Sequence, residues 1–124
     1  VREDRAGAWT FAGYVTVVWE SHYEPFRLQG IPEIVDLNVL PAHRRRGVGS
    51  RLLDAAEEAI AERCATAGIG VGLYPDYGPA QRMYVVRGYA PDARGVCYDG
   101  VPVEPLAPTV NDDSLNLYFT RRLR

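Results

Sequence analysis

The sequence predicts an α/β sandwich built on a mixed sheet. Strand and helix patterns follow one another in the order β, β, α, β, α, β, β. Strands alternate with helices in the middle of the chain and form hairpins at its ends, which is typical of helices packed on a sheet with both parallel and antiparallel neighbours. A length of 124 residues and a mass of 13.8 kDa suit a single domain, residues 1–124.

The first half of the chain predicts two strands and a helix. A β-rich run covers Gly13–Glu20, with Trp9 and Phe11 as candidates for its upstream extension, and residues 1–6 are expected to carry the end of a preceding strand. Residues 21–32 contain two prolines and a glycine, which predict a long connection that is either functional or a mobile hairpin tip. The apolar run at 33–40 predicts a buried strand.

The second half begins with the first helix. Its apolar positions recur with helical spacing from 49 to about 65, and Gly68 lies where such a helix often stops. A strand is predicted at 69–74, where alternating glycines indicate close approach to the backbone. Asp76 is expected to cap a second helix, which ends at Gly88.

The remaining expected elements are strand segments at 89–90 and 95–98, a hairpin turn at Asp99-Gly100, a proline-broken loop at 102–113 and a last strand at 114–120.

Composition excludes several classes of protein. Sixteen acidic residues against fourteen arginines, with no lysine, give a net charge of −2 and exclude a basic nucleic-acid footprint, a P-loop lysine and a lysine Schiff base. No apolar run is long enough to cross a membrane. Cys64 and Cys97 are expected to be reduced thiols of a cytoplasmic protein, and the isolated His22 and His43 give no metal-ligand spacing, so no metal is expected.

The strongest chemical signal is the basic, glycine-bearing loop before the first helix. A helix N-terminus exposes unpaired N–H groups and carries partial positive charge, and Gly47 and Gly49 leave room for a ligand. Three arginines precede them, so the loop suits a diphosphate. The alternative is a basic corner with a glycine turn. The loop does not match the Walker pattern, which requires a lysine. It does not match the dinucleotide fingerprint either, because the third glycine of that pattern would fall at position 52, which is leucine.

Two motifs resemble the GCN5-related N-acetyltransferase (GNAT) superfamily. The run Arg44-Arg45-Arg46-Gly47-Val48-Gly49 matches that family's Q/R-x-x-G-x-G/A acetyl-CoA loop, and residues 37–41 resemble the strand before it. Residues 77–89 are similar to the second signature, a helix with an alanine and then a tyrosine that ends in a glycine-aromatic pair. The resemblance covers roughly residues 9–124.

The resemblance implies a GNAT-like fold, with a mixed, mostly antiparallel central sheet flanked by helices. The family usually has a strand and two helices before the strand predicted at 13–20, and only about a dozen residues precede that strand here. The N-terminal elements are therefore expected to be short or missing. Either the chain is truncated, or its acceptor pocket is open or completed by a partner. A homodimer would cover the exposed sheet edge.

The resemblance also implies acetyl-CoA as cosubstrate, with no metal. Asn38, Val39 and Leu40 are expected to bind the pantetheine arm through backbone groups, opposite the glycine-bearing strand at 69–74, with an N–H near Val39 available to the oxyanion. The residues expected to hold the diphosphate are Arg44, Arg45, Arg46, Gly47, Val48, Gly49 and Ser50. From the second signature, Gly78, Ala80 and Gln81 are expected to bind the cosubstrate.

Two catalytic residues follow from the same resemblance. Tyr84 matches the tyrosine of the second signature and stays protonated at neutral pH, so it can donate a proton to the departing thiolate. Glu33 begins the strand that enters the active site and is expected to act as base, directly or through a water. Asp36 is expected on the opposite face of that strand. His22 and Tyr23 either line the acceptor mouth or are surface residues.

Together these inferences predict an acetyl-CoA-dependent N-acetyltransferase acting on a primary amine of a small molecule or peptide, with no nucleic-acid or membrane partner. A non-catalytic acyl-CoA-binding or regulatory module is the alternative, motivated by the missing N-terminal elements and the lack of a compelling base. A bare scaffold for protein contacts is the third reading.

Overall fold

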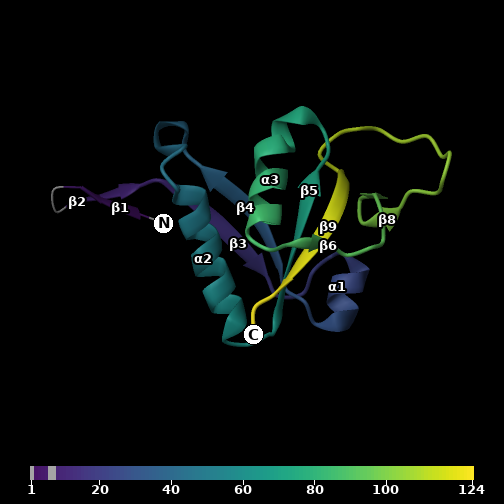
Figure 1. Cartoon of the computed structure of the whole chain (residues 1–124), viewed down its shortest axis with the longest axis horizontal. Helices are drawn as coiled ribbons and strands as arrows, with labels where there is room; N and C mark the ends of the chain where they lie inside the picture. The colour runs from purple at the N-terminus through teal and green to yellow at the C-terminus, as the bar shows by residue number, and fades with distance from the viewer. Residues whose placement is uncertain (1, 6–7) are drawn as a thin grey trace.

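The computed structural model describes residues 2–5 and 8–124, which form a twisted central sheet with helices on both faces (Figure 1). The helices are α1 (Glu24–Gln29), α2 (Val48–Ala61) and α3 (Gly78–Val86), with single 3-10 turns η1 (Pro41–His43) and η2 (Pro75–Tyr77). The strands are β1 (Arg2–Arg5), β2 (Ala8–Phe11), β3 (Gly13–Val18), β4 (Glu33–Val39), β5 (Thr66–Gly72), β6 (Ala90–Pro91), β7 (Cys97–Tyr98), β8 (Val101–Pro102) and β9 (Leu115–Arg122).

The main sheet is mixed and mostly antiparallel, as the sequence and the resemblance predict. Its strand order is β3-β4-β5-β9-β7-β8, and β6 pairs with β9. Among the described strands, β4 and β5 form the single parallel pair, because α2 connects them as a crossover helix. β1 and β2 form a separate antiparallel hairpin that projects from one end of the molecule (Figure 1).

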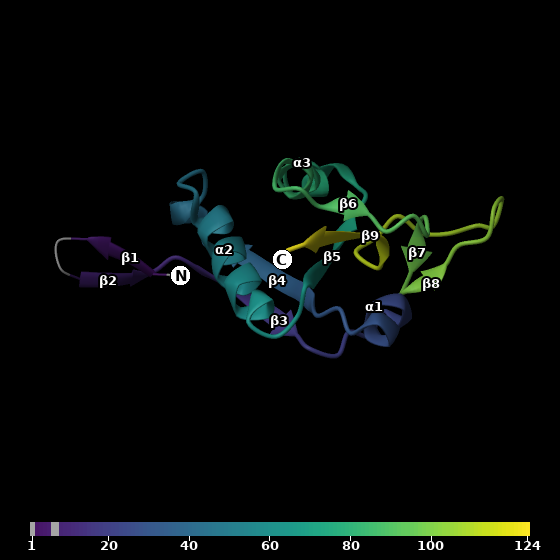
Figure 2. The same cartoon turned by 60° about the horizontal axis from the view of Figure 1, so that its bottom comes forward.

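The two faces of the sheet carry different cores. Ile69 and Val71 of β5 face α2 and α3, where the apolar stripe of α2 is buried against them. The alternate positions of β5 are glycines, and the opposite face there is covered by the ring of Phe26 from α1 and by Tyr118 of β9. Figure 2 shows α3 above β9 and α1 below it.

The glycines of β5 admit aromatic rings of this same chain. A Cβ at Gly68 would lie 2.3 Å from the Phe26 ring, and one at Gly70 would lie 2.9 Å from Tyr118. The sequence predicts close approach to this strand, and the structure identifies these rings as two of the groups that approach it.

Some predicted boundaries are wrong. Residues 21–32 were expected to be an irregular connection, but Pro25 lies in the first turn of α1 and Gly30 ends that helix in a left-handed conformation at φ 66°. These two residues act as the helix start and stop signals that short helices use. Trp9 and Phe11 do not extend the strand at 13–20, because β2 pairs with β1 outside the main sheet.

Two expectations about helix ends also fail. The helix predicted to reach position 65 ends at Ala61, because residues from Thr66 onward already pair with the end of β9, and Gly68 lies inside β5. Asp76 does not cap the second helix, since it lies within η2 and no side chain caps α3. The Asp99-Gly100 turn is confirmed: both residues have positive φ, and β7 and β8 pair across them.

Candidate active site

A cleft opens in the sheet where β4 and β5 separate. The two strands pair only at Glu33 with Gly68 and at Ile34 with Ile69. Beyond these pairs, Asp36 has φ 54° and the register of β4 against β3 shifts by one residue, which marks a β-bulge. A bulge bends the strand that carries it, so the bulge at Asp36 accompanies the divergence of β4 from β5.

The cleft has a volume of about 400 Å³ and is lined by β4, β5 and the start and middle of α3. Ala80 and Tyr84 line it, whereas Gly78 and Gln81, also expected to bind cosubstrate, are not among its lining residues. Gln81 instead donates a hydrogen bond of 2.9 Å from Nε2 to the Gly72 carbonyl, which ties α3 to the end of β5. Asp36 also lines the cleft.

The backbone of β4 presents Val39 to the side of the cleft. The Leu40 N–H donates a 2.8 Å hydrogen bond to the Ala12 carbonyl, so Leu40 is directed toward the β3 side. Neighbouring residues of a strand direct their backbone groups to opposite sides, and Val39 therefore faces away from β3. Its carbonyl accepts a 3.3 Å hydrogen bond from Arg44 Nε. Of the predicted backbone contacts, the geometry favours Val39 over Leu40.

The predicted diphosphate loop leads from β4 into α2. Arg44, Arg45 and Arg46 are exposed, and Arg45 has φ 63°, a conformation that non-glycine residues rarely adopt. Gly47 is the N-cap residue with φ 75°, and no side chain caps the helix. The N–H groups of Val48, Gly49 and Ser50 are in the first turn, where a helix offers them no acceptor, so they suit an anion.

Gly47→Ala is expected to lower the free energy of unfolding by about 1 kcal/mol, because a Cβ is strained at positive φ. The same strain is expected to distort the turn and weaken binding of acetyl-CoA, measured by calorimetry. Gly30→Ala is the matched control. Gly30 also has positive φ and no atom within 4 Å of an added Cβ, but it lies at the end of α1. Equal acetyl-CoA affinity in both variants would contradict a ligand-binding role for the turn.

Tyr84 places its side chain at the cleft from the middle of α3. It is 6% exposed, and burial raises the pKa of its phenol to about 12. Within the described part of the chain, no side chain forms a hydrogen bond with this hydroxyl. The phenol is therefore protonated at neutral pH and able to donate to a ligand in the cleft.

Glu33 borders a second hollow, of about 370 Å³, on the α1 side of the sheet. Its Oε1 accepts a 2.5 Å hydrogen bond from Ser21 Oγ. Burial raises the pKa of Glu33 above its usual value of 4.5, and the Ser21 hydrogen bond and nearby His22 oppose that rise without cancelling it. Val35 lines both this hollow and the cleft, so the two spaces meet at that residue.

His22 and Tyr23 both line the Glu33 hollow. Tyr23 is buried and stacks on Tyr118 with ring centroids 3.6 Å apart, while His22 is exposed. Tyr118, which belongs to neither sequence motif, lines the hollow as well, and burial raises the pKa of its phenol to about 12. A period-2 reading of the last strand places Tyr118 on the α1 face, but nothing local in the sequence indicates a hollow there.

The long loop before β9 contacts the wall of the cleft through Asp113. Asp113 accepts hydrogen bonds from the hydroxyls of Tyr74 and Tyr77, and these bonds lower the pKa of its carboxyl. Tyr77 lines the cleft and Asp113 lines the hollow, so this hydrogen bond links the linings of the two spaces. Sequence motifs do not reveal this pairing, because its partners lie more than 30 positions apart.

The glycine turn, the uncapped helix start and the tyrosine in the cleft lie where the two motifs of the resemblance place them. The model of the acetyltransferase (GNAT) family matches residues 4–89, and the chain belongs to this family. This confirms the resemblance and the fold class that the sequence predicts.

Solved structures with this fold include Ard1 from Thermoplasma volcanium, with a TM-score of 0.63 and 21% identity over 94% of this chain and 65% of that one. A ribosomal-protein-alanine N-acetyltransferase from Brucella melitensis has a TM-score of 0.64 and 17% identity, over 98% of this chain and 66% of that one. The yncA structure from Salmonella typhimurium, solved with its cofactor acetyl-CoA, has a TM-score of 0.62 and 16% identity, over 97% of this chain and 61% of that one.

At these identities the likeness concerns the fold, and the chain spans about two thirds of the length of these structures or slightly less. No curated protein sequence matches the chain. Over the described ranges, no helix is long and apolar enough to span a membrane. Within the same ranges, no three metal-ligating side chains gather at one point.

Proposed function

We propose that this chain is an acetyl-CoA-dependent N-acetyltransferase that transfers an acetyl group to a primary amine of a small molecule or peptide by direct attack on the thioester. One observation carries the proposal. The strand that leads through η1 to the glycine turn before α2 is the strand whose exposed backbone edge borders the cleft of Tyr84. A diphosphate site and a proton donor therefore lie along a single path.

The residues of this path suit the parts of acetyl-CoA, which supplies an activated acetyl group. The N–H groups of Val48, Gly49 and Ser50 would hold the diphosphate, with the exposed arginines 44–46 adding positive charge. The Val39 N–H would bind a polar group of the pantetheine arm or the thioester oxygen, since it faces the side of the cleft.

The chemistry requires two proton movements, and the site offers one group for each. As the C–N bond forms, Glu33 would accept the proton of the attacking amine, directly or through a water. As the C–S bond breaks, Tyr84 would donate its phenol proton to the departing thiolate. The raised pKa of Glu33 brings that carboxyl closer to the pKa that a base needs near neutral pH.

Carboxylates around the hollow favour an amine acceptor. Asp99 and Asp113 line it together with Glu33, and the two tyrosine hydrogen bonds keep Asp113 ionised. Such a surface attracts a protonated amine before Glu33 removes its proton. Acceptors are therefore expected to be cationic at neutral pH.

The test is binding followed by turnover. Acetyl-CoA at 100 times its Kd is expected to stabilise the protein by about 2.7 kcal/mol, seen as a rise in Tm. Acetyl-pantetheine, which lacks the diphosphate, is the control and is expected to bind more weakly. Thiol release is then measured with an alanine-initiated peptide, a polyamine and a simple alkylamine. Absence of acetyl-CoA binding would overturn the proposal.

A non-catalytic acyl-CoA-binding or regulatory module is the second candidate. Its supporting observation is the exposed acceptor side, where His22 and Asp99 lie at the surface of the hollow. Acetyl-CoA binding without thiol release for any amine would favour this candidate over the enzyme.

A further inference from the structure

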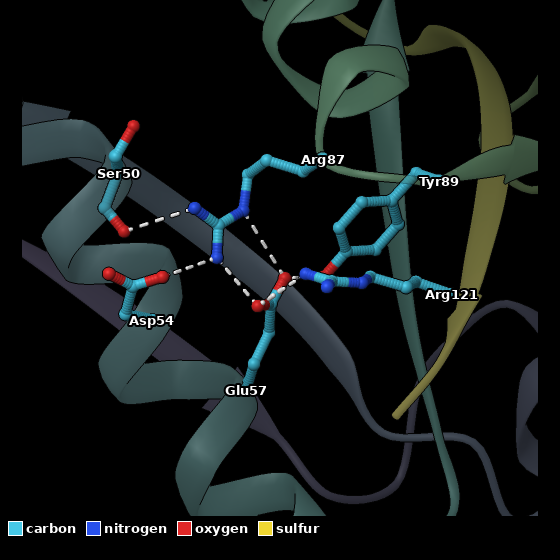
Figure 3. A network of polar contacts seen from close by, with 6 residues as sticks. All are labelled: Ser50, Asp54, Glu57, Arg87, Tyr89 and Arg121. Atoms are coloured by element: carbon cyan, nitrogen blue, oxygen red, sulfur yellow. Dashed lines mark hydrogen bonds and ion pairs between the residues drawn. The ribbon is translucent and has the colours of Figure 1, made fainter. Parts of the chain in front are cut away.

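A buried carboxylate, Glu57, joins three elements behind the candidate site. Figure 3 shows it on α2, facing Arg87 at the end of α3 and Arg121 of β9. Its Oε1 lies 2.6 Å from Arg87 Nη2 and 2.8 Å from Arg121 Nη1, and its Oε2 accepts a 2.8 Å hydrogen bond from the Tyr89 hydroxyl. Glu57 is 8% exposed, so these partners compensate a charge that is largely shielded from water.

Arg87 extends this contact to the first turns of α2. Its Nη2 lies 2.8 Å from Asp54 Oδ1, and its Nη1 donates a 3.3 Å hydrogen bond to the Ser50 carbonyl (Figure 3). Ser50 belongs to the turn that suits a diphosphate. One guanidinium therefore connects the C-terminal end of α3 with both the first turn and the middle of α2.

Arg87 lies close to Tyr84 along the chain, so the contact of Arg87 with α2 also affects where the Tyr84 phenol lies. The two residues are three positions apart on and just beyond α3, so a shift of Arg87 also moves the phenol. A ligand that extends from the diphosphate turn to the cleft has a fixed length between its phosphates and its reacting atom. The separation between α2 and α3 must match that length for the phenol to reach the sulfur.

We infer that Arg87 and Glu57 are positioning residues that set the separation between the diphosphate-binding turn and the Tyr84 phenol. Arg87 supplies the link from α3 to α2, and Glu57 holds the guanidinium in place. Arg121 and Tyr89 fix the Glu57 carboxylate from β9 and from the residue after α3. The inference rests on the function proposed above.

The test is a double-mutant cycle between Arg87→Gln and Tyr84→Phe, with acetyl-CoA and the panel amine that is acetylated fastest. Arg87→Gln alone is expected to lower kcat by about 10²-fold, because a misplacement of about 1 Å has that effect. The Kd of acetyl-CoA is expected to change little. In the Tyr84→Phe background the same substitution is expected to lower kcat hardly at all, since no phenol proton is left to position.

Arg121→Gln is the matched control, because Arg121 contacts Glu57 but the structure gives it no contact with Ser50 or Asp54. It is expected to lower Tm and to lower kcat far less than Arg87→Gln does, because Arg87 keeps its own contacts with Ser50 and Asp54. A purely structural role for Arg87 predicts equal losses of kcat in both Tyr84 backgrounds, and that result would overturn the inference. So would an unchanged kcat in Arg87→Gln. Where Arg87→Gln does not fold, Arg87→Lys retains the charge and carries the same cycle.

Failure of this inference is distinguishable from failure of the proposed function. A wild-type protein that binds and turns over acetyl-CoA, with independent effects in the cycle, overturns the positioning role alone. A wild-type protein that does not bind acetyl-CoA overturns both.

Discussion

Tyr84→Phe is expected to lower kcat by about 10²- to 10⁴-fold, which is the usual contribution of a positioned acid, and to leave the Kd of acetyl-CoA nearly unchanged. The phenol lines the cleft and has no hydrogen-bond partner among the described side chains, so the variant loses the hydroxyl without breaking a contact with another of these side chains. A thiol-release assay measures kcat, and calorimetry measures the Kd of acetyl-CoA separately.

Tyr77→Phe is the matched control for this prediction. Tyr77 lines the same cleft, but its hydroxyl donates a 2.6 Å hydrogen bond to Asp113 and is not available to a ligand. Loss of the Tyr77 hydroxyl is expected to lower kcat far less than loss of the Tyr84 hydroxyl does. Because Tyr84 stays protonated up to a pKa of about 12, kcat is not expected to fall on its account between pH 7 and 10. Equal turnover of Tyr84→Phe and the wild type would exclude the acid role.

Glu33→Gln is expected to lower kcat by a similar factor and to remove the acidic limb of the pH–rate profile. A base works in its ionised form, so wild-type kcat rises as pH increases through the pKa of Glu33. Burial raises that pKa above 4.5, and the limb is therefore expected at higher pH than for an exposed glutamate. A profile of kcat against pH in both proteins checks this.

Stability provides the control for the Glu33 variant. A carboxyl whose pKa is raised by folding binds its proton more tightly in the native state, so its favourable contribution is lost as pH rises through the folded pKa. Glutamine cannot ionise and can still accept the Ser21 hydrogen bond. At neutral pH, Glu33→Gln is expected to be at least as stable as the wild type. A fall in Tm with unchanged kcat would show that Glu33 is structural.

Most of the fold could be predicted because its signals are local. The buried run that became β4, the apolar stripe of α2 and the glycine just after α3 each occupy a few neighbouring positions. The sequence failed where long-range pairing decides the outcome. β5 begins at Thr66 because β9 pairs with it there, and helix α1 is too short and too polar to show helical periodicity.

Part of the candidate site could likewise be predicted from the sequence, and part could not. The glycine turn and Tyr84 could be found from motif spacing, whereas the bulge at Asp36 could not, because a non-glycine residue gives no sign of positive φ. Glu57 did leave a signal. It lies four positions after Leu53 and three before Ile60, inside the apolar stripe of α2, where a charged residue indicates a buried partner. The identity of that partner required the fold.

The meeting of the cleft and the hollow at Val35 has a consequence for how the two reactants arrive. Acetyl donor and amine would enter from opposite faces of one sheet, through separate openings that meet at Val35. Neither reactant then has to leave before the other arrives. Under the proposed function, such a layout suits a ternary complex with direct transfer and gives the enzyme no need to store the acetyl group on a side chain of its own.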